Sequence, residues 1–170
     1  MSTGMVINLS EGHSLVSNWV AELRDTEIQK DRMRFRRNLE RIGEVAAYEI
    51  SKILPAVDRE VTTALGTANA QVLAEQPVLT TILRAGLPLH QGLLNYFDQA
   101  DCAFVSAYRK HHPDGSFEIA LEYYSSPDIE DRILILSDPM LATGASLVKR
   151  RSGLRYQNPE LAEIIGSVLK

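Results

Sequence analysis

Hydrophobic residues recur every three or four positions in the first third of the chain, and this spacing predicts two amphipathic helices. The first runs from about Gly12 to Arg24, with Ser10 as its capping residue. Its apolar positions are Leu15, Val16, Trp19, Val20 and Leu23. The second follows Asp31 and ends before Pro55. Its apolar face holds Phe35, Leu39, Ile42, Ala46, Ile50 and Ile53.

From about residue 60 the pattern changes to short apolar or β-branched runs, which predict strands. These runs are 60–63, 78–83, 102–108, 117–123 and 133–136. A helical stretch from Leu87 to Phe97 lies between the second and the third run. Strands that alternate with helices, one of them the unbroken apolar run Ile133 to Leu136, predict an α/β fold. Its parallel sheet is expected to be covered on both faces.

The segment from His111 to Tyr124 has a different pattern. Two extended runs flank Pro113-Asp114-Gly115, which is a turn signal. We therefore expect a hairpin that protrudes from the sheet.

Length and charge narrow the class of protein. A chain of 170 residues with 45% hydrophobic residues can bury one sizeable core, so we expect a single domain over residues 1–170. The net charge of -4 argues against sequence-independent binding of nucleic acid. No apolar run approaches the roughly 18 residues of a membrane span, and the first residues do not form a signal sequence. With Cys102 as the single cysteine, a reducing, cytoplasmic location is expected.

Two groups of residues could suggest a binding site, but neighbouring residues or spacing argue against it in each case. The arginine-rich part of the second helix holds Arg32, Arg34, Arg36, Arg37 and Arg41. Asp31, Glu40 and Glu44 are interleaved with these arginines, as on a solvated, salt-bridged face, and this favours such a face over a nucleic-acid or anion-binding patch. The histidines are His13, His90, His111 and His112. They lack the spacing of a zinc site.

The loop after the strand 133–136 is the strongest candidate for a ligand site. It reads Asp138-Pro139-Met140-Leu141-Ala142-Thr143-Gly144-Ala145-Ser146. Ligands of open α/β sheets bind beyond the carboxyl ends of the strands, where Asp138 would stand. Gly144 permits close approach of the backbone, and the amides from Ala142 to Ser146 suit a phosphate at a helix N-terminus. The Asp138 carboxylate can accept hydrogen bonds from ribose hydroxyls.

Two nucleotide-binding loops do not fit this segment, whereas an ordinary turn does. It lacks the Gly-Lys-Ser/Thr ending of a nucleotide P-loop and the glycine spacing of a dinucleotide loop. An ordinary strand-to-helix turn capped by Asp138 or Thr143 fits its small residues equally well.

The sequence of the loop resembles the phosphoribosyl diphosphate loop of phosphoribosyltransferases. The stretch Asp-Pro-Met-Leu-Ala-Thr-Gly is similar to the corresponding loop of the uracil enzymes. The resemblance spans residues 10 to 148 and includes other segments. These are His13-Ser14-Leu15-Val16, Arg24-Asp25, Glu44-Val45-Ala46-Ala47-Tyr48-Glu49 and Ile82-Leu83-Arg84-Ala85-Gly86-Leu87. The chain thus resembles a type I phosphoribosyltransferase specific for uracil.

The resemblance implies an activity and a set of site residues. It implies transfer of the phosphoribosyl group from 5-phospho-α-D-ribose 1-diphosphate to uracil, giving UMP and diphosphate, with Mg²⁺ carried by the donor diphosphate. Arg84 and Arg109 fall on the diphosphate-binding arginines of the family, and Asp138 and Arg84 are the expected catalytic residues. Arginine suits a diphosphate because it offers planar donors that stay charged. The fold implied is a parallel sheet flanked by helices.

The resemblance also implies partners. The hairpin with Glu118, Glu122, Tyr123 and Tyr124 resembles the arm that covers the site and contributes to subunit contacts, so a homo-oligomer, with a dimer favoured, is expected. A plain exposed hairpin is the alternative.

Residues 148–170 do not resemble the family and are expected to be a divergent or truncated tail. The segment Tyr-Ile-Val-Pro-Gly-Leu-Gly-Asp-Ala-Gly-Asp, which recognises uracil in the family, is not found, so no uracil-binding residue is assigned. Apolar residues after Pro159 predict a short helix. They are Leu161, Ile164, Ile165, Val168 and Leu169. Two further hypotheses stay open: a catalytically silent phosphoribosyl- or nucleotide-binding regulator, and a phosphoribosyltransferase for another base.

Overall fold

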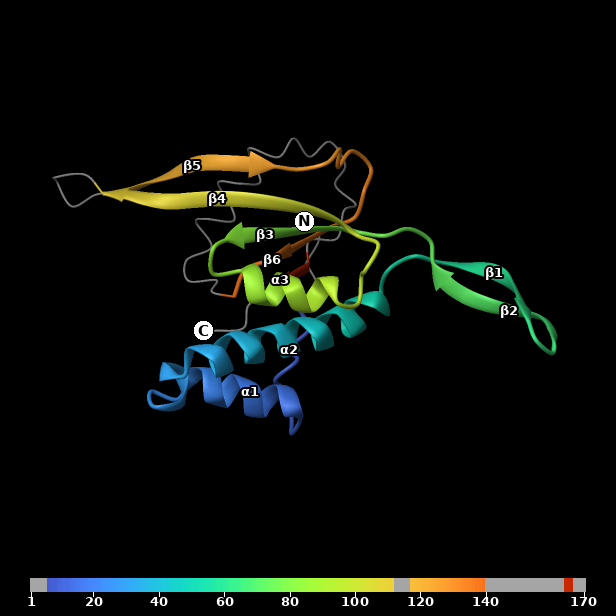
Figure 1. Cartoon of the computed structure of the whole chain (residues 1–170), viewed down its shortest axis with the longest axis horizontal. Helices are drawn as coiled ribbons and strands as arrows, with labels where there is room; N and C mark the ends of the chain where they lie inside the picture. Colours follow the sequence, from blue (N-terminus) through green and yellow to red (C-terminus); the bar gives the residue numbers. More distant parts are fainter. Residues whose placement is uncertain (1–5, 112–116, 140–163, 167–170) are drawn as a thin grey trace.

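A computed structural model of the chain describes residues 6–111, 117–139 and 164–166 (Figure 1). The helical elements are α1 (Leu15–Arg24), the short 3-10 helix η1 (Ile28–Lys30), α2 (Arg32–Ser51) and α3 (Leu87–Leu94). The strands are β1 (Ala56–Thr63), β2 (Gly66–Leu73), β3 (Val78–Leu83), β4 (Asp101–His111), β5 (Phe117–Ser125), β6 (Leu134–Ser137) and β7 (Ile164–Gly166). No helix in the described part of the chain is long and apolar enough to cross a membrane.

Both predicted N-terminal helices are confirmed, but the cap of α1 is Ser14 and not Ser10. Ser14 and Ser17 form a reciprocal capping box: the Ser17 amide donates to Ser14 Oγ over 3.4 Å, and the Ser14 amide donates to Ser17 Oγ over 3.0 Å. The hydroxyl of Ser10 donates instead to the side chain of Asn8. The α1 helix therefore begins at Leu15, later than expected.

The central sheet has the strand order β5-β4-β3-β6-β7. β3 pairs in parallel with both β4 and β6, and only β4–β5 is antiparallel. The expected α/β architecture built on a parallel sheet is confirmed. The predicted helix after Pro159 is wrong at Ile164–Gly166, which pair in parallel with Ile135–Ser137 of β6. Two β-branched isoleucines fit a pleated strand, and there they satisfy the backbone groups at the edge of β6.

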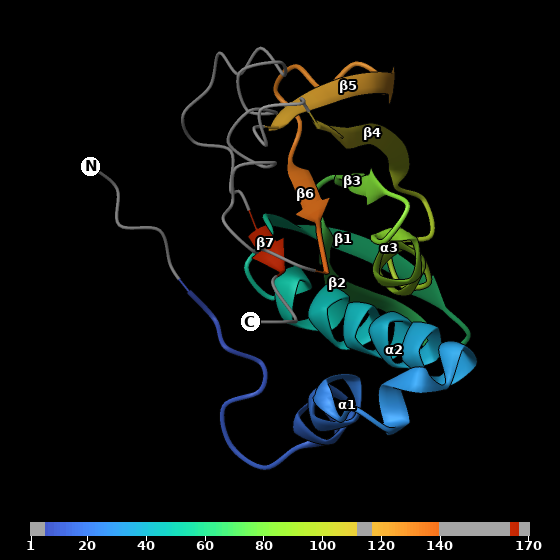
Figure 2. The same cartoon turned by 90° about the vertical axis from the view of Figure 1, so that its left-hand side faces the viewer.

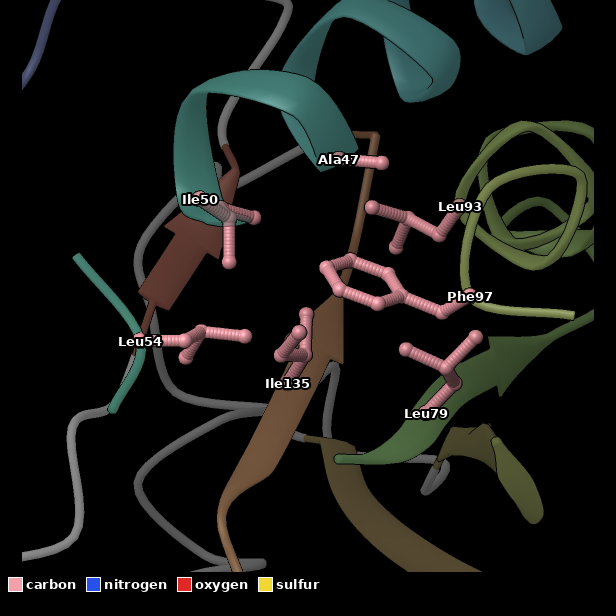
Figure 3. Close-up of a cluster of buried hydrophobic side chains, with 7 residues drawn as sticks. All are labelled: Ala47, Ile50, Leu54, Leu79, Leu93, Phe97 and Ile135. Atoms are coloured by element: carbon pink, nitrogen blue, oxygen red, sulfur yellow. The ribbon is translucent and has the colours of Figure 1, made fainter. Parts of the chain in front are cut away.

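One hydrophobic core lies between the sheet and the helices. Figure 2 shows α2 between α1 and the sheet, with α3 beside it. Leu79 of β3 and Ile135 of β6 stand opposite each other in register and contact residues of α2, α3 and the segments that follow these helices (Figure 3). Those residues are Ala47, Ile50, Leu54, Leu93 and Phe97. On the other face of the strands, Val78, Ala103 and Leu134 pack with Ile129. In the described ranges, α2 and α3 therefore cover one face of the sheet.

Two hairpins project from opposite ends of the molecule (Figure 1). The expected one is confirmed: β4 and β5 pair from Phe104↔Ser125 to His111↔Phe117, and its predicted turn residues 113–115 lie outside the described residues. The other hairpin, β1–β2, was only half foreseen, because the strand 60–63 was predicted and its partner was not. Its residues are almost all exposed, so its sequence lacks the apolar alternation that marks a half-buried strand.

The arginine-rich face of α2 is a salt-bridged face, as predicted. Arg34 contacts Glu22 of α1 over 2.6 Å, and Arg37 contacts Glu40 over 2.7 Å. Hydrogen bonds from Arg34 and Asn38 lower the pKa of the Glu22 carboxyl to about 2. The Arg34–Glu22 pair joins α1 to α2, whereas the Arg37–Glu40 pair lies within α2.

Candidate functional site

The carboxyl ends of β3 and β6 lie side by side at one edge of the sheet. The two strands are parallel neighbours, and their last paired residues are Thr81 and Ser137. Arg84 follows β3 directly, and Asp138 follows β6 directly. The structure therefore brings the loops that carry these two predicted site residues to the same edge, where ligands of α/β sheets bind.

Two buried hydrogen bonds fix the strand ends against each other. The Thr81 hydroxyl donates to the Ser137 carbonyl over 3.2 Å, and the Ser137 hydroxyl donates to the Thr80 carbonyl over 3.2 Å. Thr81 and Ser137 are 0% and 2% exposed, so water does not compete for these bonds. The prediction from sequence did not include either residue. The signal was present, because Thr80 and Thr81 interrupt an apolar strand and Ser137 precedes the aspartate.

The segment 83–86, here named the Arg84 loop, makes a tight turn between β3 and α3. The Gly86 amide donates to the Ile82 carbonyl over 3.0 Å, and the peptide bond between Leu83 and Arg84 is cis. A Cβ on Gly86 would lie 2.1 Å from Thr81 Oγ1 and 2.8 Å from the Ile82 carbonyl oxygen. Only glycine fits there. The Arg84 side chain is exposed, just before the N-terminal end of α3, where the helix dipole favours anions.

Asp138 occupies a different environment from Arg84. It is 9% exposed, and the next residue, Pro139, is also buried. A carboxylate this deep at a strand end presents oxygens in a fixed place, which suits vicinal hydroxyls of a sugar. The remaining predicted loop residues, Met140, Leu141, Ala142, Thr143, Gly144, Ala145 and Ser146, lie outside the described residues.

Arg109 lies on β4, the other neighbour of β3. The last β3–β4 pair is Leu83↔Ser106, so the backbone of Arg109 is three residues further along the strand, opposite Ile119 of β5. At about 3.3 Å per residue, that is roughly 10 Å beyond the sheet edge. Arg109 therefore belongs to the projecting part of β4, at the same end of the parallel strands as the Arg84 loop.

The arrangement can hold a ligand that is anionic in one part and rich in hydroxyls in another. The exposed Arg84 guanidinium and the start of α3 attract anionic oxygens. The buried Asp138 carboxylate can accept hydrogen bonds. Neither side chain has to form a covalent bond to such a ligand, so the pair can act by position and charge.

Known proteins resemble this chain over most of its length. A family model described as uracil phosphoribosyltransferase matches residues 10–167, which extends beyond residue 148 into the tail. Uracil phosphoribosyltransferase from Porphyromonas gingivalis is 54% identical over 166 residues, covering 95% of this chain and 77% of the relative. The enzyme of the same name from Thermococcus gammatolerans is 32% identical over 160 residues, covering 92% and 70%. Among solved structures, the AQ2163 protein from Aquifex aeolicus superposes with a TM-score of 0.73 at 28% identity, covering 88% of this chain and 69% of that one.

Proposed function

The chain belongs to the uracil phosphoribosyltransferase family, and from that premise we propose that the sheet edge formed by β3, β4 and β6 is its donor-binding site. The chain is a transferase of pyrimidine salvage with a type I phosphoribosyltransferase fold. It transfers the phosphoribosyl group of 5-phospho-α-D-ribose 1-diphosphate to uracil, which gives UMP and diphosphate. The observation that carries the site assignment is the shared sheet edge of Arg84 and Asp138, with their strands joined through Thr81 and Ser137.

The donor is proposed to span the edge of the sheet. Its diphosphate would lie against Arg84 and the start of α3, with Arg109 as a second cation. Asp138 would accept hydrogen bonds from the ribose hydroxyls. The 5-phosphate would be bound by residues 139–146. The exposure of Arg84 and the burial of Asp138 support this order, because the charged leaving group then faces solvent and the sugar lies deeper.

Catalysis in this site would be electrostatic. As diphosphate leaves, the anomeric carbon of the donor gains oxocarbenium character. The buried carboxylate of Asp138 would stabilise that positive charge, while Arg84 and Arg109 would offset the charge that develops on the leaving diphosphate. Holding donor and base in line supplies the rest of the rate enhancement.

Magnesium is proposed to enter with the donor. Mg²⁺ prefers oxygen ligands and is commonly bound by substrate phosphates together with one or two carboxylates. The donor set at this edge suits that preference, since Asp138 offers carboxylate oxygens beside the proposed diphosphate position. When bound, Mg²⁺ would neutralise part of the diphosphate charge.

A homodimer that works in the cytoplasm is also proposed. The β1–β2 hairpin supports self-association, because an isolated two-stranded hairpin is marginally stable in water and this one exposes apolar side chains. Val57, Val61 and Leu65 are 48%, 37% and 101% exposed. The β4–β5 hairpin exposes Tyr123 and Tyr124 as well. Light scattering of the purified chain tests this proposal, and a monomer at micromolar concentration would contradict it.

The activity is tested by UMP formation from the donor, uracil and Mg²⁺. The matched control is Thr143→Asp, which places a negative charge in the predicted phosphate loop. UMP above this control is the expected result. Donor binding by calorimetry without turnover would point to a silent regulator instead. A panel of free bases, assayed for diphosphate release, distinguishes uracil from another acceptor.

A further inference from the structure

His90 is a buried histidine whose side chain has no hydrogen-bond partner among the residues that the structure describes. The residue is 4% exposed, and neither Nδ1 nor Nε2 is bonded. Nearly all buried polar atoms in folded proteins are paired, and an unpaired one costs about 1–3 kcal/mol. An apolar side chain would fill the same space without this cost. An imidazole at this position therefore points to a role beyond packing.

His90 lies one helical turn behind the Arg84 loop. Its backbone amide donates to the Gly86 carbonyl over 2.9 Å, which makes it part of the first hydrogen-bonded turn of α3. Side chains on a helix lean toward its N-terminus. The imidazole of His90 therefore covers the turn that begins at Gly86.

The other side of the imidazole contacts β4. The rings of His90 and Phe104 are 5.2 Å apart at an interplanar angle of 60°, an edge-to-face contact. Phe104 stands opposite Thr81 in the β3–β4 register. The His90 ring thus lies between the first turn of its own helix and β4, the strand that carries Arg109.

The environment of the imidazole favours its uncharged form. Burial is the cause that lowers the pKa of His90 below its usual value. Nearby carboxylates have other partners: Glu40 and Glu44 of α2 accept hydrogen bonds from Asn95, beyond the far end of α3, and Asp101 of β4 is ion-paired. A neutral imidazole has one donor and one acceptor nitrogen. His90 can therefore give one hydrogen bond and take another.

We propose that His90 is a positioning residue for the donor diphosphate, and that its imidazole gains a hydrogen-bond partner in the Arg84 loop when the diphosphate is bound. The loop has no room to move toward β3, because Gly86 already fills the space beside Thr81 and Ile82. Adjustment of the loop therefore involves the first turn of α3, which His90 supports. Pairing the ring in the bound state removes a cost that the free state carries, and this adds to donor affinity. The inference rests on the proposed function of this site.

Two variants separate this role from simple packing. His90→Phe keeps an aromatic ring and removes both nitrogens, whereas His90→Gln keeps a donor and an acceptor. We expect His90→Phe to raise the KM for the donor about tenfold, the effect of one buried hydrogen bond, with kcat within about twofold. Its melting temperature should equal or exceed that of the wild type. His90→Gln should have a KM for the donor between those of His90→Phe and the wild type. An unchanged KM in a folded His90→Phe variant overturns the proposal.

A second measurement uses the wild-type chain alone. The ¹⁵N resonances of the His90 ring are followed while Mg²⁺-diphosphate is added. They are identified by exclusion with variants of His13, His111 and His112, the other histidines of the chain. A shift that saturates with diphosphate is expected. Constant resonances in a chain that binds diphosphate overturn the inference, whereas a wild-type chain that neither binds diphosphate nor forms UMP contradicts the proposed function instead.

Discussion

Thr81 and Ser137 stand opposite each other on β3 and β6, and the Thr81 hydroxyl donates a buried hydrogen bond to the Ser137 carbonyl. This bond lies between the two loops of the proposed donor site. Arg84 begins the loop after one strand, and Asp138 begins the loop after the other. The distance between the exposed Arg84 and the buried Asp138 thus depends in part on this contact between the strands, outside the loops themselves.

The first prediction compares Thr81 with its neighbour. Thr81→Val should destabilise the fold by about 1 kcal/mol, because it leaves the buried Ser137 carbonyl without this donor. The matched control is Thr80→Val. Thr80 is equally buried, yet its hydroxyl has no partner in the described part of the chain, so this change should be neutral or stabilising. Urea denaturation of the two variants measures the difference. Equal losses would contradict the role given to the Thr81 hydroxyl.

A second prediction concerns the charge of Arg84. The Arg84 side chain is exposed and makes no hydrogen bond or ion pair within the described ranges, so Arg84→Ala should leave the melting temperature within about 1 °C. It should raise the KM for the donor by one to two orders of magnitude, as expected for loss of a charge-assisted contact of about 1.5–3 kcal/mol. Arg84→Lys should restore the KM for the donor only in part, since lysine lacks the planar fork of donors. Arg36→Ala, an exposed arginine on α2, is the control, and an equal effect there would sink the assignment.

Much of this architecture could be predicted from the sequence, for identifiable reasons. Asp31 marked the start of α2, and the apolar run at Ile133 to Leu136 marked strand β6, because capping and burial are local or periodic signals. The β1–β2 hairpin was harder, since a strand exposed on both faces carries no alternation. Contacts that depend on tertiary neighbours, such as Thr81 with Ser137, leave no spacing pattern.

The same limit applies to the candidate site. The aspartate and the small residues of the loop 138–146 fitted a phosphate site and an ordinary turn equally well, and the family resemblance favoured the phosphate site. Asp138 does lie at the strand end. The placement of Arg84 beside it required the strand order, which periodicity does not give. His90 looked like an ordinary helix residue, because its missing partners are a property of the packed structure.

A third prediction follows from the pKa of Glu22, which hydrogen bonds from Arg34 and Asn38 lower from 4.5 to about 2. A depressed carboxyl pKa stabilises the folded state above its unfolded value, and the contribution is lost as pH falls through the folded value. Glu22→Gln should therefore lower the melting temperature by a few degrees near neutral pH, about 1 kcal/mol. The difference from wild type should shrink between pH 4.5 and about 2.

Thermal denaturation across this pH range measures the effect. The control is Glu27→Gln, whose partner Lys30 and own side chain are 67% and 79% exposed, so it should change stability little at any pH. A wild-type advantage over Glu22→Gln that persists unchanged down to about pH 2 would mean that the ionised carboxylate is not what joins α1 to α2.

The last prediction concerns the crossing of α2 and α3, which sets where the Arg84 loop ends. Gly92 of α3 and Gly43 of α2 permit backbone contact: a Cβ on Gly92 would lie 2.0 Å from the Glu40 carbonyl oxygen, and one on Gly43 would lie 2.3 Å from the Leu89 carbonyl oxygen. Helix propensity alone favours alanine over glycine by about 1 kcal/mol. Overpacking against backbone should outweigh this, so Gly92→Ala should destabilise by about 1–3 kcal/mol.

Gly92→Ala should also raise the KM for the donor, because the two helices must separate and α3 carries the Arg84 loop at its start. Gln91→Ala, at the adjacent exposed position, is the matched control and should leave both quantities nearly unchanged. Denaturation curves of the two variants give the free energy of unfolding, and initial rates at varied donor concentration give the KM. A Gly92→Ala variant as stable as the wild type would contradict the claim that the α2 and α3 backbones leave no room for a Cβ at this position.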